Sequence, residues 1–351
     1  MGWIVGVRDG GGLNARLHRL CSGDVSGLLR VIEGVRLRGS ERVVCGYEAG
    51  RDGFWLARYL GARGIDCVVL DPASLPVERR ARRTKSDRLD VHLLLRGLMG
   101  LAGGERGACR VVRVPSRAAE DVRQVHRERE ALLRERVCHV NRIKVLLAAQ
   151  GIDGFEPLRD GAAALAGLRD SEGRPLAPHL RSRLEREGGR LAVVVEQIAA
   201  VEATRDALAA RQAGDSGAAK VRRLAALKGI GVQTTTVLTR EVLWRDFTNR
   251  RQLGGYVGLT PTPWRSGGMV REQGIGKAGN ARARTALIEL AWLWLRWQPD
   301  SALTRWFHSR VGTATGRVRR IAIVALARKL AVALWRYVHT GLVPDGAVLK
   351  A

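Results

Sequence analysis

Arg42-Val-Val-Cys-Gly-Tyr47, closed by Glu48-Ala-Gly50, is the stretch that decides the fold class. Its apolar run is short and ends on a turn signal, which is typical of a buried strand. Residues 25–35 before it carry apolar side chains at helical spacing, and residues 53–63 after it form a second predicted helix. Because strands alternate with helices, this part of the chain is predicted to be an α/β layer structure.

The same alternation extends in both directions from that strand. Ile4–Val7 is a predicted strand, Asp9-Gly-Gly-Gly12 a turn, and Leu13–Leu20 the returning strand of a hairpin. Cys67–Leu70 is the next predicted strand, and a helix runs from Ser86 to about Met99. A basic run separates these last two elements: Arg79, Arg80, Arg82, Arg83 and Lys85.

Two glycine-rich breaks, residues 100–107 and 214–217, divide the chain into three predicted domains. The first, residues 1–100, is the α/β domain. The second, residues 108–213, contains two long charged helices with apolar residues every three or four positions, which predicts an antiparallel coiled-coil hairpin. The third, residues 216–351, is predicted to be all-α with interruptions, and its tryptophans are expected in the core or at a subunit interface.

Composition indicates a polyanionic partner. The chain has 351 residues, of which 46% are apolar, and a formal net charge of +26 that comes mostly from arginine. A field of that sign attracts polyanions, and the planar guanidinium suits phosphate, so nucleic acid is the first expectation. No apolar run approaches the roughly 20 residues of a membrane-spanning helix, and no signal peptide is evident. Five cysteines without a Cys-x-x-Cys pair predict reduced thiols in a cytosolic protein and no zinc site.

Three acidic residues in the first domain are candidate metal ligands. Glu48 follows a strand end, where α/β folds place functional groups. Asp87 and Asp90 are three residues apart at a helix start and share one helix face. Hard oxygen ligands of this kind suit Mg²⁺, which drives phosphodiester chemistry in two-metal sites. The alternative is that the two aspartates only complement the helix dipole.

Two segments of the third domain are candidate nucleic-acid contacts. Gly229-Ile230-Gly231 lies between two predicted helices, the pattern of a helix-hairpin-helix whose backbone N–H groups hold a phosphate. A plain helix–turn–helix connection is the alternative; in either case Ile230 is expected in the core. The stretch from Gly258 to Gly268 is predicted to be a loop, and it carries Ser266 next to Arg265. Alone, this is an ordinary surface loop.

In order and separation, these segments resemble the DEDD insertion-sequence transposases, the IS one-ten family. Tyr47-Glu48-Ala-Gly-Arg-Asp-Gly, Asp71-Pro72 and Lys85-Ser-Asp87-Arg-Leu-Asp90 resemble the family's N-terminal domain. The C-terminal transposase domain is matched by Leu227-Lys-Gly-Ile-Gly, Tyr256-Val-Gly-Leu-Thr-Pro261, Ser266-Gly-Gly and Gly276-Lys-Ala-Gly-Asn280. The resemblance covers almost the whole chain. It implies a RuvC-like, ribonuclease-H-type domain, whose four acids bind Mg²⁺, and a bacterial cytoplasmic protein associated with the nucleoid.

The resemblance also implies a reaction. Ser266 would be the nucleophile that attacks a DNA phosphodiester and forms a covalent phosphoserine, and Glu48, Asp87 and Asp90 would be three of the four acids. Some members use a structured noncoding RNA that pairs with donor and target DNA, and the family suggests a dimer or tetramer. The residues expected to contact nucleic acid are Gly229, Gly231, Arg265, Lys277, Asn280, Arg282, Arg284, Arg82, Arg83 and Lys85.

One position departs from the family pattern. The family's first acid lies on its first strand, and here the only candidate is Asp9, which fits better at the corner of a hairpin. A ribonuclease-H-type sheet begins with three antiparallel strands, and only two are predicted before the first helix. We therefore expect the chain to begin at the family's second strand, with weaker metal binding. The rival functions are a metal-dependent nuclease or resolvase and a non-enzymatic or inactive nucleic-acid-binding remnant.

Overall fold

The chain divides into two compact units, Met1–Ser116 (unit 1) and Arg117–Ala351 (unit 2). The computed structural model describes residues 2–8, 15–37, 42–50, 53–75, 86–105, 107–210, 216–266 and 269–350. The structure is mixed α/β and mostly helical, as the sequence predicted. The division into three domains at the two glycine-rich breaks stays a prediction.

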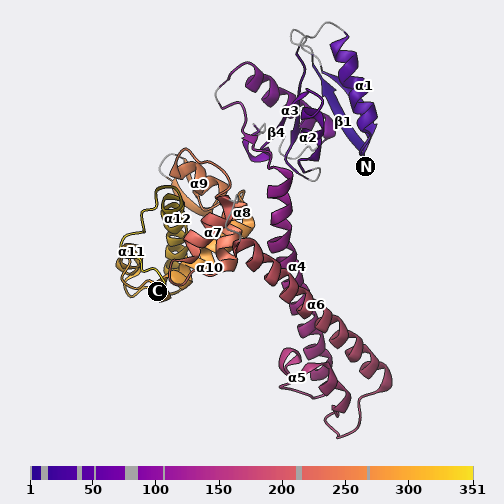
Figure 1. Ribbon diagram of the computed structural model, residues 1–351, viewed down its shortest axis with the longest axis vertical. Helices are drawn as coiled ribbons and strands as arrows, with labels where there is room; N and C mark the ends of the chain where they lie inside the picture. The colour runs from indigo at the N-terminus through magenta and orange to yellow at the C-terminus, as the bar shows by residue number, and fades with distance from the viewer. Residues whose placement is uncertain are drawn as a thin grey trace. The chain divides into compact units, whose positions relative to one another are not determined.

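Unit 1 contains short strands alternating with helices (Figure 1). An antiparallel pair, β1–β2, forms one small sheet; in a second sheet β4 lies between β3, to which it is parallel, and β5, to which it is antiparallel. Most of the elements agree with the predicted ones to within a few residues, but the last strand, at residues 111–112, was not predicted and lies in the range assigned to the second domain. In chain order they are β1 (Gly2–Val7), β2 (Arg16–Cys21), α1 (Val25–Arg36), β3 (Val44–Glu48), α2 (Trp55–Gly61), β4 (Asp66–Leu70), the 3-10 turn η1 (Pro72–Ser74), α3 (Asp87–Ala102) and β5 (Val111–Val112).

Helix α3 packs on both sheets of unit 1 because each sheet presents a glycine to it. A Cβ atom on Gly6 of β1 would lie 2.3 Å from Val91 Cγ1, and one on Gly46 of β3 would lie 3.1 Å from Leu98 Cδ1. In the described part of unit 1, no ladder joins β1 to β3. The two strands β1 and β2 precede the first helix, as predicted. The single sheet of a ribonuclease-H-type fold stays a prediction.

The parallel pairing of β3 with β4 sets Cys45 opposite Cys67. Burial raises the pKa of Cys45 to about 11 and the pKa of Cys67 to about 12. Both thiols therefore stay protonated and unreactive near neutral pH. All five cysteines are free, and of these Cys21 and Cys138 are exposed.

Unit 2 begins with two long helices that lie side by side, α4 (Arg117–Ala148) and α6 (Pro178–Ala210) (Figure 1). Arg129 of α4 contacts Glu202 of α6, while His139, farther along α4, contacts Glu187, farther back on α6. The two helices are therefore antiparallel, as the apolar spacing predicted; a coiled-coil supercoil stays a prediction. The connection contains α5 (Pro157–Ala164) and the 3-10 turn η3 (Leu165–Gly167).

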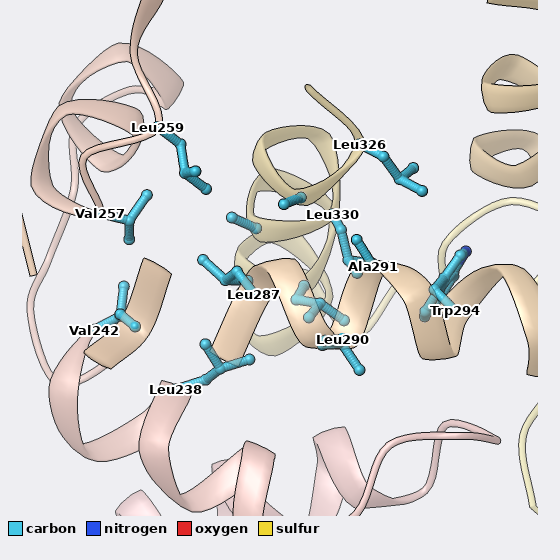
Figure 2. Close-up of a cluster of buried hydrophobic side chains, with 14 of the residues drawn as sticks. Leu238, Val242, Val257, Leu259, Leu287, Leu290, Ala291, Trp294, Leu326 and Leu330 are labelled. Atoms are coloured by element: carbon cyan, nitrogen blue, oxygen red, sulfur yellow. The ribbon is translucent and has the colours of Figure 1, made fainter. Parts of the chain in front are cut away.

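The rest of unit 2 packs around a single apolar core. Figure 2 shows Leu287, Leu290, Ala291 and Trp294 of α10 directed into it, and each is at most 1% exposed. Trp294 Nε1 donates to Ser301 Oγ at 2.8 Å, so the indole is buried with its polar atom paired. The elements are α7 (Ser216–Ala225), α8 (Val232–Glu241), α9 (Arg250–Tyr256), β6 (Pro261–Ser266), β7 (Met269–Ile275), α10 (Ala281–Trp297), α11 (Ala302–Val311) and α12 (Gly316–Thr340).

The β-hairpin β6–β7 was not predicted in this otherwise helical region. Pro261 and Pro263 argue against a central strand, because proline cannot donate to a ladder. In a two-stranded hairpin every strand is an edge, and a register shift lies between the two prolines, so both are accommodated. Among the described residues, no helix is long and apolar enough to cross a membrane.

Candidate active site

Ser266 is the last residue of β6 and pairs with Met269, the first residue of β7. The predicted loop is therefore a strand up to Ser266, and the serine lies at the tip of the hairpin. For Arg265 and Ser266 the structure describes the backbone only. The sequence Gly267-Gly268 separates the two strands.

The base of this hairpin is closed by backbone contacts that require glycine. Gly276 N donates to Thr260 O at 2.7 Å, and Asn280 N donates to Tyr256 O at the same distance. Gly258 has a φ of +68°, which favours glycine. At Gly279 an added Cβ atom would lie 2.3 Å from Tyr256 O. The segments before and after the hairpin are thus held in direct backbone contact.

We expect Gly279→Ala to lower the free energy of unfolding of unit 2 by about 3 kcal/mol. The added methyl group would clash with backbone atoms, which cannot move aside as a side chain can. The matched control is Gly255→Ala in α9, where an added Cβ meets nothing within 4 Å. Replacing an exposed helical glycine in this way is expected to be neutral or stabilising by up to about 1 kcal/mol. Chemical denaturation of both variants measures the difference; equal stabilities would contradict the close contact.

Several predicted nucleic-acid contacts have intramolecular partners near this base. Asn280 caps α10 by accepting from Ala283 N at 3.0 Å, and its amide nitrogen donates to Glu241 Oε2 at 3.0 Å. Arg282 forms an ion pair with Glu130, and Arg284 Nη1 donates to Lys277 O at 3.0 Å. These contacts position the hairpin base and the start of α10. Contact with nucleic acid by these residues stays a prediction.

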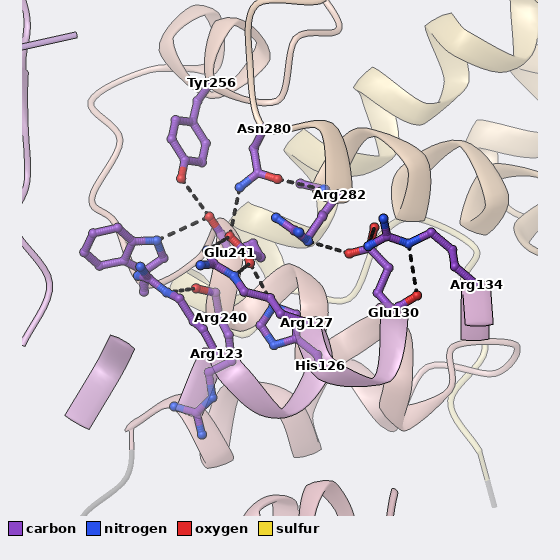
Figure 3. Close-up of polar contacts among 12 residues, drawn as sticks. Arg123, His126, Arg127, Glu130, Arg134, Arg240, Glu241, Tyr256, Asn280 and Arg282 are labelled. Atoms are coloured by element: carbon purple, nitrogen blue, oxygen red, sulfur yellow. Dashed lines mark hydrogen bonds and ion pairs between the residues drawn. The ribbon is translucent and has the colours of Figure 1, made fainter. Parts of the chain in front are cut away.

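Glu241, the last residue of α8, is the centre of a buried polar cluster (Figure 3). Its carboxylate lies 2.8 Å from His126 Nε2 and accepts from Arg127 Nε at 2.9 Å. Its backbone carbonyl accepts from the Tyr256 hydroxyl at 2.9 Å. Through Asn280 and Tyr256, this one residue joins α4 and α8 to both sides of the hairpin base.

The charge of Glu241 is stabilised by its neighbours. Burial alone would raise the pKa of Glu241, but hydrogen bonds from His126 and Arg127 outweigh it, together with the charge of Arg127 and the amide of Asn280, and hold the pKa well below its usual range. Arg123, whose Nε donates to Arg240 O at 3.0 Å, lies in the same cluster, and burial lowers its pKa.

The Gly229-Ile230-Gly231 turn lies between α7 and α8, and Ile230 is 1% exposed, which confirms its predicted place in the core. Gly229 has a φ of +83°, and an added Cβ atom would lie 2.4 Å from Trp297 Cβ. Gly231 is the N-cap residue of α8. Packing therefore explains Gly229, while a helix-hairpin-helix that binds phosphate stays a prediction.

The predicted acids lie where the sequence placed them, at the end of β3 and in the first turn of α3. Glu48 and Asp87 are exposed and Asp90 is half-buried. Ser86 is the N-cap of α3, so the two aspartates follow the cap and complement the helix dipole. Within the described residues no three His, Cys, Asp or Glu side chains form a group that could hold a metal ion. Asp9, Arg82, Arg83 and Lys85 lie outside the described residues.

Comparison with known proteins identifies the family. Residues 221–305 match the family model described as "Transposase IS116/IS110/IS902 family", and residues 13–150 match a DEDD transposase model of the IS110 group. The chain is 46% identical to "Putative transposase y4rJ" of Sinorhizobium fredii, over 99% of this chain and 92% of that protein. It is 26% identical to "Transposase for insertion sequence element IS1328" of Yersinia enterocolitica, over 82% and 81% of the two chains. The chain therefore belongs to the IS116/IS110/IS902 family of transposases.

Proposed function

We propose that this transposase cuts and rejoins DNA with Ser266 as its nucleophile. The observation that carries the proposal is the position of this serine, at the tip of a hairpin whose base is fixed by Gly276, Gly279 and Asn280. A nucleophile must reach a phosphate in a defined orientation. A serine at the end of a strand, on a hairpin whose base is held by backbone contacts, meets both needs. The family match covers this segment as well.

The chemistry is a pair of transesterifications. Ser266 Oγ attacks the phosphorus, a new serine–phosphate ester bond forms, and one bond from phosphorus to a sugar oxygen breaks. The serine proton is lost, and the leaving sugar oxygen takes up a proton. The phosphodiester linkage is conserved in the phosphoserine, so a second sugar hydroxyl can reverse the step on a new strand.

Mg²⁺ belongs to the proposal as a predicted cofactor of Glu48, Asp87 and Asp90. Bound there, it would polarise the phosphate oxygens. The described residues do not fit such a site as they stand, since they form no group of three possible ligands. A guide RNA and a dimer or tetramer are further expectations from the resemblance. The phosphate-binding turn at Gly229 and Gly231 is an expectation from the glycine pattern alone.

Adduct trapping tests the proposal. The full chain would be incubated with duplex DNA carrying candidate element ends, with Mg²⁺ or with a chelator, and with or without flanking transcripts. A band that resists denaturation and yields a nucleotide-modified Ser266 peptide in mass spectrometry is the expected result. Cleaved DNA without a covalent product would support the metal-dependent nuclease instead, and DNA binding without any cleavage would support the non-enzymatic remnant.

A further inference from the structure

A hollow of about 540 Å³ lies among α9, α11 and α12 in unit 2, and none of its lining residues belongs to the hairpin base or to the Glu241 cluster. Nine residues line it, and four of them are apolar and half-buried, so they form its floor. The other five are cationic. The lining residues are Arg250, Arg251, Leu303, Ala325, Arg328, Lys329, Val332, Ala333 and Arg336.

Within the described part of the chain, the cations of this hollow have no acidic partner. Among the described residues, no acid lines the hollow and none of the five cations takes part in an ion pair. Some other arginines of unit 2 do have an acidic partner, as Arg142 has Glu187 and Arg127 has Glu241. Like charges gathered in a concave site raise its positive potential and attract an anion.

The positions of these cations follow from local structure. Six lining residues recur at positions i, i+3, i+4, i+7, i+8 and i+11 of α12, so they share one face of that helix: Ala325, Arg328, Lys329, Val332, Ala333 and Arg336. Gly254 of α9 leaves room for one of them: an added Cβ there would lie 3.1 Å from Arg328 Nε. Lys329 Nζ lies 4.6 Å from the centre of the Trp306 ring. Arg250 and Arg251 come from α9, so the charges face the hollow from more than one helix.

We propose that this basic hollow, formed by α9, α11 and α12, binds the sugar–phosphate backbone of duplex DNA. Each phosphate carries one charge, so five cations from two helices match a run of phosphates better than a single small anion. Arginine suits phosphate oxygens, and the apolar floor suits deoxyribose carbons. Contacts of this kind hold DNA without reading its sequence. The inference rests on the proposed function, which makes DNA the substrate.

Salt-dependent binding tests the inference. The slope of log Kobs against log salt concentration, measured by fluorescence anisotropy with a labelled duplex, reports the number of phosphate contacts, at about 0.9 for each. The variant Arg250→Gln/Arg336→Gln removes one exposed cation from α9 and one from α12. We expect its slope to be shallower by about 1.8. Its free energy of unfolding should change by no more than about 0.5 kcal/mol.

The matched control is Arg183→Gln/Arg186→Gln, which removes two exposed arginines of α6 and so changes the net charge equally. Its slope should stay near that of the unchanged protein. An unchanged slope in the α9/α12 variant, an equal loss in the control, or a loss seen only with RNA of the same length would overturn the inference. Binding is measured without Mg²⁺ and does not depend on adduct formation. A failure to form the adduct would therefore contradict the proposed function without changing the measured salt dependence of DNA binding.

Discussion

Ser266→Ala is expected to lower the rate of covalent protein–DNA adduct formation by about 10³-fold or more, because no other atom of the hairpin tip supplies the attacking oxygen. The substitution removes a single oxygen from the end of a strand whose ladder uses backbone atoms only. The fold should therefore persist, with a change in the free energy of unfolding of no more than about 0.5 kcal/mol. Quantifying the adduct on denaturing gels, alongside an unfolding curve, measures both effects.

Thr262→Ala is the matched control, since it removes a hydroxyl from the same strand. Thr262 Oγ1 donates to Gly274 O at 3.3 Å within the hairpin. Its loss should leave adduct formation within a few-fold of the unchanged protein. An undiminished adduct in Ser266→Ala would exclude the serine as nucleophile. An equal loss in both variants would mean that hairpin geometry, and not the Ser266 hydroxyl, limits the reaction.

Periodicity predicted most of the fold because it reports burial directly. Alternating apolar strands and helices in unit 1, and apolar residues every three or four positions in α4 and α6, all correspond to elements of the structure. The β6 strand escaped prediction because Pro261 and Pro263 are ordinarily signals against strands. The two prolines already favour extended backbone, but no local pattern encodes the pairing with β7 that makes this segment a strand.

Part of the candidate site was likewise predicted from the sequence, and part was not. The position of Ser266 came from the resemblance of short motifs, and that of Glu48 from the end of a strand. The contacts that fix the hairpin base could not be predicted, because they join residues far apart in sequence: His126 and Glu241 are 115 positions apart. A buried ion cluster of this kind produces no periodic pattern in the amino-acid sequence.

Glu241→Gln is expected to lower the free energy of unfolding of unit 2 by about 3 to 5 kcal/mol. The side chain of Glu241 is only 4% exposed. Removing its charge leaves Arg127 and the buried Arg123 without their shared counter-charge. The matched control is Glu202→Gln on α6, whose carboxylate pairs with Arg129 and is 33% exposed. That change should cost no more than about 1 kcal/mol, because solvent screens the pair.

The pH dependence of this difference provides a second readout. Because the pKa of Glu241 is lower in the folded protein than in the unfolded chain, its contribution to stability is fully present above the ordinary carboxyl pKa of about 4.3. The contribution is lost as pH falls through the folded value, where the carboxyl takes up a proton. The stability difference between the unchanged protein and Glu241→Gln should therefore be constant from pH 5 to 6 and shrink in more acidic solution. A difference that grows in acid would mean that Glu241 binds its proton more tightly when folded, which its contacts with His126, Arg127 and Asn280 oppose.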